Sequence, residues 1–165
     1  MEFVLFVLFA FTLSSSLIAY AIYSILMERK EKIAIREQID YLAKNALELS
    51  PQEFFEIRNK KFGGRGGALY SNNFNFTGVY ILHNQSKDSY YVGQGKKVLD
   101  RVNSHFTGKG NGDIYADYKY GDKWTIKMIA LDHSSFDSLN ELEKYTIEIY
   151  HSYEKGYNRT RGNKG

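Results

Sequence analysis

Apolar residues follow one another from Phe3 to Met27 without a single charged residue among them. A helix over this run would measure roughly 37 Å at about 1.5 Å per residue. A hydrocarbon core is about 30 Å thick, so the pattern predicts a transmembrane helix over residues 1–27 that contacts the membrane through residues 3–27. Lys and Arg residues cluster only after the run, which predicts a single-pass membrane protein whose C-terminal bulk is cytoplasmic.

A secretory signal peptide is the alternative for this segment, with Ala19-Tyr20-Ala21 as its cleavage site. Apolar residues continue past that site as far as Met27, and no Lys or Arg precedes the run. Both features favour the membrane anchor. A signal peptide would instead make the protein a secreted one.

Residues 28–67 predict a helical juxtamembrane region that ends in a glycine-rich linker. Apolar positions three and four apart form one stripe over residues 33–49, suited to packing on a neighbouring domain, with self-association beside the membrane as an alternative. A second helix begins after Ser50, because Ser50 can cap it and Glu53 can complete a capping box. The run Gly63–Gly67 is typical of a flexible linker.

From residue 68 the apolar segments become short, which predicts one compact α/β (α+β) domain over residues 68–165. The pattern predicts a β-hairpin over about 78–94, a helix over about 96–106 and an ordered loop over Thr107–Asp122. Apolar residues alternate over Lys123–Leu131, which predicts a third strand. Ser138 can cap a last helix that runs to about Tyr150.

The hairpin carries one tyrosine in each strand. If it is symmetric about the polar loop at residues 84–87, Tyr80 faces Tyr91 with Cβ atoms roughly 5 Å apart. Gly78 and Gly93 lie on the same face and leave room for a close approach. The hairpin thus predicts two phenols held side by side next to open space.

Composition narrows the chemistry only in part. The chain of 165 residues contains no cysteine, which excludes a disulfide framework, a thiolate zinc site and a cysteine nucleophile. Its formal net charge of +3 is too mild to establish a nucleic-acid partner.

Four polar residues stand out in the second half of the chain. Arg101 and His105 are four apart, so both project from one face of their helix, although a solvated helix face is the alternative. Glu143 falls inside a largely apolar stripe, where a carboxylate costs free energy unless a cation, hydrogen bonds or a structural salt bridge receives it. Asn158 would ordinarily be a turn asparagine.

In order and spacing, these residues resemble the GIY-YIG nuclease superfamily over about residues 77–161. Gly78-Val79-Tyr80 corresponds to the GIY element and Tyr91-Val92-Gly93 to the YIG element. The arginine, histidine, glutamate and asparagine of the family correspond to Arg101, His105, Glu143 and Asn158. The resemblance implies a small antiparallel three-stranded sheet flanked by helices.

The resemblance also implies a divalent-metal-dependent endonuclease that acts on DNA. Glu143 would hold one Mg²⁺ or Mn²⁺, Arg101 would bind the scissile phosphate, and Tyr80 would orient the attacking water. Tyr91 and His105 complete the catalytic set, and Gly78, Gly93 and Asn158 would bind the substrate or support the site. No long DNA-recognition region follows the motifs, so we expect low sequence specificity.

A catalytically silent nucleic-acid-binding module on a membrane anchor is the alternative from another functional class. Loss of Tyr80, Arg101 or Glu143 would favour it, and all three residues are present.

Overall fold

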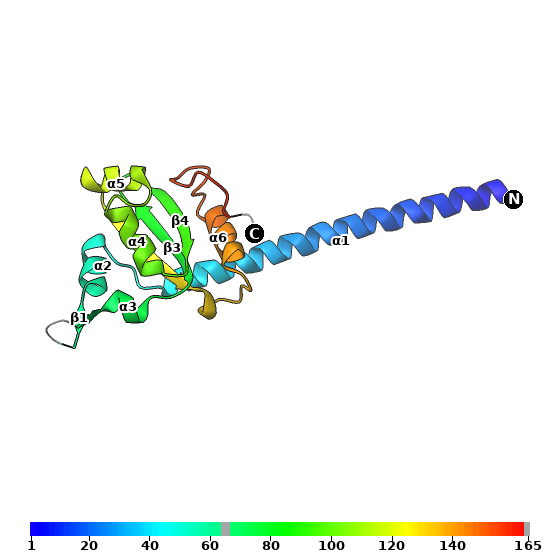
Figure 1. Ribbon diagram of the computed structural model, residues 1–165. Coiled ribbons are helices and arrows are strands. Elements are labelled where there is room, and N and C mark those ends of the chain that lie inside the picture. Colours follow the sequence, from blue (N-terminus) through cyan, green and yellow to red (C-terminus); the bar gives the residue numbers. More distant parts are fainter. Residues whose placement is uncertain (64–66, 164–165) are drawn as a thin grey trace. The chain divides into compact units, whose positions relative to one another are not determined.

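The structure is a computed structural model that describes residues 1–63 and 67–163, with the backbone alone for residues 2–15 and Phe62. The chain divides into two units, Met1–Gln38 and Ile39–Gly165. Figure 1 shows the elements of both.

The first unit consists of the greater part of helix α1 (Glu2–Asn45). Within the residues whose side chains are described, no helix is both long and apolar enough to cross a membrane. The predicted span over residues 3–27 lies partly outside this range, because the side chains of residues 2–15 are not described. The membrane anchor therefore stays a prediction.

The second unit is built on an antiparallel sheet of three strands, β3 (Gly78–Asn84), β4 (Ser89–Gly95) and β5 (Trp124–Ala130), in the order β4-β3-β5. The central strand is buried along nearly its whole length. A strand covered on both faces needs apolar side chains on both, which explains the unbroken run from Val79 to Leu82. The predicted hairpin and third strand are confirmed.

The predicted hairpin register is wrong by two positions. Tyr80 lies opposite Gly93, and Tyr91 lies opposite Leu82. A shift of two residues keeps each side chain on its own face of the sheet, so Tyr80 and Tyr91 still share a face, as predicted.

The cause of the shift is Asn84, which was expected in the loop and instead ends β3. Its side-chain carbonyl accepts hydrogen bonds from the N–H groups of Ser86 and Lys87, at 3.0 and 3.2 Å. Its side-chain amide donates to Asp122 and to the Tyr157 hydroxyl, each at 2.7 Å. These partners bury Asn84 and move the turn one residue further along the chain.

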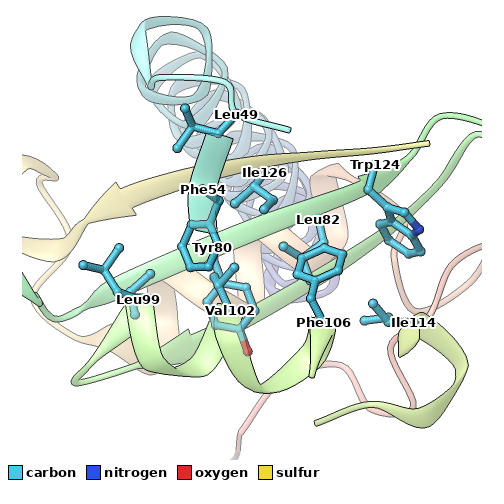
Figure 2. Packing of buried hydrophobic residues seen from close by; sticks show 11 residues of the cluster. Leu49, Phe54, Tyr80, Leu82, Leu99, Val102, Phe106, Ile114, Trp124 and Ile126 are labelled. Carbon is cyan, nitrogen blue, oxygen red and sulfur yellow. The ribbon is translucent and has the colours of Figure 1, made fainter. Parts of the chain in front are cut away.

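One face of the sheet packs against helices α2 (Pro51–Arg58) and α4 (Val98–Phe106). Figure 2 shows this core, in which Tyr80 and Leu82 of β3 lie among side chains of the covering helices. Helix α6 (Leu139–Ile149) packs on β3 and β4, and its buried Leu142 and Ile147 do not belong to this cluster. Both faces of the sheet are therefore covered.

Both predicted capping residues are confirmed. Ser50 and Glu53 form the capping box of α2, in which the Ser50 N–H donates to the Glu53 carboxylate at 2.8 Å. Ser138 caps α6, where its hydroxyl accepts a hydrogen bond from the Glu141 N–H at 3.1 Å.

The predicted loop Thr107–Asp122 is wrong in part, because it contains helix α5 (Gly112–Lys119). Asn111 is the N-cap of this helix, and its side-chain oxygen accepts from the Asp113 N–H at 2.9 Å. The helix buries Ile114 in the core. A single fully buried apolar residue gives little periodicity, so the pattern alone did not show the helix.

The remaining elements are short: β1 (Lys61–Phe62), β2 (Ala68–Leu69), α3 (Tyr70–Phe74) and the 3₁₀ helix η1 (Leu131–His133). β1 and β2 pair antiparallel with each other. Residues 64–66, at the centre of the predicted glycine linker, lie outside the described residues.

Residues ahead of 68 contribute to the core of the sheet domain. Leu49 and Ile126 exchange two backbone hydrogen bonds, at 3.0 and 2.8 Å, and Phe54 of α2 is buried in the core. The predicted limits of the nuclease domain stay a prediction.

Candidate active site

A polar cavity of about 270 Å³ lies where β4, α4, α6 and the segment after Asn158 meet. Its walls include four of the predicted catalytic residues, Tyr80, Tyr91, Arg101 and Glu143, together with Gly93 and Asn158. The fold thus gathers residues of β3, β4, α4, α6 and the C-terminal segment around one space.

His105 lies behind Tyr80, on the core side of the cavity. Both side chains are fully buried or nearly so. The Tyr80 hydroxyl and His105 Nε2 are 2.9 Å apart, which is hydrogen-bond distance. Arg101 and His105 are one turn apart on α4. Arg101 lies in the wall of the cavity, whereas His105 contacts Tyr80 and does not line the cavity.

The hydrogen bond at Nδ1 determines which nitrogen of His105 carries the proton. The backbone N–H of Asn111 donates to His105 Nδ1 at 3.0 Å. A backbone amide can only donate, so Nδ1 carries no proton and the neutral ring carries its proton on Nε2. Burial, followed by the charge of Arg101, lowers the pKa of His105 to about 4. The neutral ring therefore donates from Nε2 to the Tyr80 oxygen.

This contact depends on a glycine. A Cβ on Gly110 would lie 2.7 Å from His105 Nδ1. Because such a contact is too close, only glycine lets the backbone at residues 110–111 approach the imidazole ring.

The two phenols lie side by side, with ring centroids 6.1 Å apart. Burial raises the pKa of Tyr80 well above its ordinary range, and the neighbouring Tyr91 raises it further. Burial also raises the pKa of Tyr91. The charge of Arg101 opposes both shifts, since a nearby cation favours the phenolate.

Arg101 is exposed, although it forms part of the cavity wall. The aliphatic part of its side chain packs against Gly95, where a Cβ would lie 2.8 Å from Arg101 Cγ. The guanidinium is thus supported along its stem while it remains accessible to a ligand.

Glu143 is only 7% exposed. Its Oε2 accepts hydrogen bonds from Gln94 Nε2 at 2.9 Å and from the Asn163 N–H at 3.1 Å. Burial nevertheless raises the pKa of the carboxyl group. No salt bridge to Glu143 occurs among the residues that the structure describes, so hydrogen bonds alone compensate this buried carboxylate.

The donor set suits a hard divalent cation. Within the described part of the chain, no three His, Cys, Asp or Glu side chains gather into a complete metal site. Magnesium commonly takes one or two carboxylates and completes its shell with water and substrate phosphates. Glu143 at the cavity wall fits that mode of binding, and a cation there would relieve the cost of the buried charge.

Asn158 supports the site through backbone contacts. Its side-chain oxygen accepts from the Val92 N–H at 2.9 Å, and its side-chain nitrogen donates to the Val92 carbonyl at 2.7 Å. The amide side chain is therefore bound to β4 between Tyr91 and Gly93.

The two predicted glycines differ in position. A Cβ on Gly93 would collide with the Tyr80 phenol, so this glycine makes space for the Tyr80 side chain. A Cβ on Gly78 would collide with the Ile129 carbonyl on β5, and Gly78 is not part of the cavity wall. Packing accounts for both glycines, and substrate binding by either one stays a prediction.

The sequence reasoning missed several residues that shape the site: Gln94, Asn111, Arg159 and Asn163. Asn111 had a signal, since an asparagine at the N-cap with an aspartate in the first turn, here Asp113, is typical of a helix start. The others act through contacts that are distant in the sequence.

Comparison with known proteins identifies one matching family. A family model for the GIY-YIG catalytic domain matches residues 76–158. Among solved structures, the chain is similar to a mutant of the catalytic domain of intron endonuclease I-TevI, with 22% identity and a TM-score of 0.42, over 54% of this chain and 98% of that one. No curated protein sequence matches significantly. The family match spans half of the chain, and we conclude that the chain belongs to the GIY-YIG family and is a GIY-YIG endonuclease.

Proposed function

We propose that this protein is a membrane-anchored, divalent-metal-dependent endonuclease that hydrolyses DNA phosphodiester bonds with low sequence specificity. The observation that supports the reaction is the single polar cavity that Tyr80, Arg101 and Glu143 share. The charge-free run at residues 3–27 supports the anchor, and the basic residues after it support a cytoplasmic nuclease domain.

Arg101 binds the scissile phosphate. Arg101 is exposed, and its guanidinium can donate two parallel hydrogen bonds to phosphate oxygens. Bound there, it also neutralises part of the negative charge that grows on the phosphoryl group during attack by water.

In this scheme the Tyr80 hydroxyl first loses its proton to solvent water in the cavity. The phenolate then orients the attacking water and accepts its proton as the water oxygen bonds to phosphorus and the leaving oxygen departs. Burial works against the phenolate, so the site must supply compensating interactions. Two are visible: the Nε2–H of His105, which donates to the Tyr80 oxygen, and the positive charge of Arg101. In this scheme His105 is a hydrogen-bond donor and not the base that deprotonates Tyr80, because its other nitrogen already accepts from Asn111.

Glu143 would hold one Mg²⁺ or Mn²⁺, with Gln94 and the Asn163 N–H fixing one carboxylate oxygen. When bound, the cation supplies electrophilic stabilisation of the leaving oxygen and of the charge developing on the phosphate. Tyr91 lines the same cavity, with its ring beside that of Tyr80.

The decisive experiment is cleavage of plasmid, linear duplex and single-stranded DNA by the full chain with Mg²⁺ or Mn²⁺. Glu143→Ala should abolish cleavage while DNA binding, measured by fluorescence anisotropy, persists. Glu148→Ala is the matched control, because Glu148 lies on the same helix and is exposed. Its cleavage rate should equal that of the unaltered chain.

A catalytically silent binding module is the second candidate. It is favoured by a chain that binds DNA but cuts none of these substrates with either metal ion. Recovery of the full chain in the membrane fraction, with the nuclease domain open to protease only from the cytoplasmic side, tests the anchor. A mature N-terminus near Tyr23 would instead identify a signal peptide.

A further inference from the structure

The segment that follows Asn158 carries positive charge to the rim of the cavity. Arg159 is one of the residues that line it, together with Arg101 from α4. The two arginines therefore reach the same space from different elements, and neither the motifs nor their spacing drew attention to Arg159.

In the structure, Arg159 is paired with an acidic residue. Its Nη2 lies 3.1 Å from Asp113 Oδ2, to which it donates a hydrogen bond. Asp113 stands in the first turn of α5. The Arg159 side chain is 78% exposed and that of Asp113 is 62% exposed, so water reaches both partners.

The backbone on either side of Arg159 is held in place. Before it, the side chain of Asn158 binds both backbone groups of Val92, and the Tyr157 carbonyl accepts from Asn111 Nδ2 at 3.2 Å. After it, the Asn163 N–H donates to Glu143. Arg159 is thus a fixed point on the chain with an accessible side chain, as a residue that binds substrate requires.

The ion pair is weak enough to exchange. An exposed ion pair contributes little to stability, whereas an arginine on a DNA phosphate makes charge-assisted bonds and releases counterions. A phosphate group at the cavity should therefore displace the Asp113 carboxylate from Arg159.

We propose that Arg159 is a second phosphate-binding arginine of the site, which contacts a DNA phosphate next to the one held by Arg101. Asp113 occupies Arg159 when DNA is absent and competes with the phosphate for it. This inference rests on the proposed function, because it takes DNA as the ligand.

The first test measures binding of the full chain to a fluorescent DNA duplex across a range of salt concentrations, with EDTA present to prevent cleavage. Arg159→Gln should weaken binding about tenfold at low salt, the loss expected for one charge-assisted hydrogen bond. It should also reduce the slope of log K against log salt concentration by about 1.

Arg161→Gln is the matched control. Arg161 is 77% exposed, lies two residues further on and does not line the cavity. It removes the same charge from the same segment, so it should weaken binding clearly less than Arg159→Gln does.

The second test examines the competitor. Asp113→Asn should tighten binding about threefold in the unaltered chain, in keeping with a weak exposed ion pair. In the Arg159→Gln background the same change should have a smaller effect, because no arginine remains to be released. Glu154→Gln removes a carboxylate that faces Arg161 at 3.8 Å and controls for net charge.

Two results would overturn the inference: equal losses for Arg159→Gln and Arg161→Gln, or the same gain from Asp113→Asn in both backgrounds. If the unaltered chain still cuts DNA in that case, the proposed function survives and only the role of Arg159 is lost. A chain that neither binds nor cuts DNA overturns the proposed function, and the inference with it.

Discussion

At the scale of single residues, the site depends on a buried neutral histidine. His105 receives a backbone hydrogen bond on Nδ1 and reaches the Tyr80 oxygen with Nε2. Its pKa is lowered from 6.5 to about 4 by burial and by Arg101. The folded protein therefore keeps this ring neutral at pH values where an unfolded chain would protonate it.

The sign of the resulting pH dependence follows by linkage. Between pH 6.5 and about pH 4 the unfolded chain binds more protons at His105, so the free energy of unfolding falls as the pH is lowered. The expected loss is about 3 kcal/mol, complete near the lower value. Urea denaturation at a series of pH values measures it. His105→Gln should remove this part of the pH dependence, whereas a variant of the exposed His133, His133→Gln, should retain it.

At the scale of elements, the hairpin and the helix after it must fit closely around Tyr80. Gly93 is the narrowest point, because a Cβ there would occupy the position of the phenol. The pleat of β4 therefore determines where the Tyr80 hydroxyl lies relative to the cavity.

Gly93→Ala should displace the Tyr80 ring. We expect a loss of cleavage rate of about 100-fold, the usual cost of misplacing a catalytic group by about 1 Å, and a loss of stability of about 1–3 kcal/mol from overpacking. Rates under single-turnover conditions and urea denaturation measure the two effects. Gly112→Ala is the control, since a Cβ there meets no atom within 4 Å and alanine favours a helix. Unchanged cleavage by Gly93→Ala would contradict the proposed role of Tyr80.

The local sequence pattern predicted those helices and strands whose signals lie within the element itself. Alternation predicted β5, and the capping residues Ser50 and Ser138 predicted the starts of α2 and α6. The register was not predictable in this way, because Asn84 joins β3 through hydrogen bonds to Asp122 and Tyr157, both distant in the sequence.

The candidate site shows the same division. Helical spacing and the family motifs brought out Tyr80, Arg101 and Glu143, which the fold does place around one cavity. Spacing could not show that Asn111 determines the protonation of His105, since that contact belongs to a tertiary turn.

At the scale of the whole molecule, the catalytic sheet requires chain that precedes the family motifs. Leu49 pairs with Ile126 on β5, and Phe54 fills the core beside Tyr80. Neither residue is part of the family match, which begins at residue 76.

A fragment of residues 39–165 should therefore fold cooperatively, whereas a fragment of residues 68–165 should not. Loss of the buried Phe54 side chain alone costs about 3–5 kcal/mol, a large part of the stability of a small domain. Thermal unfolding of the two fragments, followed by circular dichroism, checks this. Equal melting temperatures would show that residues 39–67 are dispensable and would support a domain that begins at residue 68.

The Gly156-Tyr157-Asn158 turn has a consequence beyond the site. β4 is an outer strand of the sheet, and its unpaired backbone groups would be a template for another chain. The Tyr157 N–H donates to the Tyr90 carbonyl, and the Asn158 side chain occupies both backbone groups of Val92. The residues that complete the cavity wall therefore also occupy backbone groups along this edge, and we expect the same asparagine to hinder the addition of another strand.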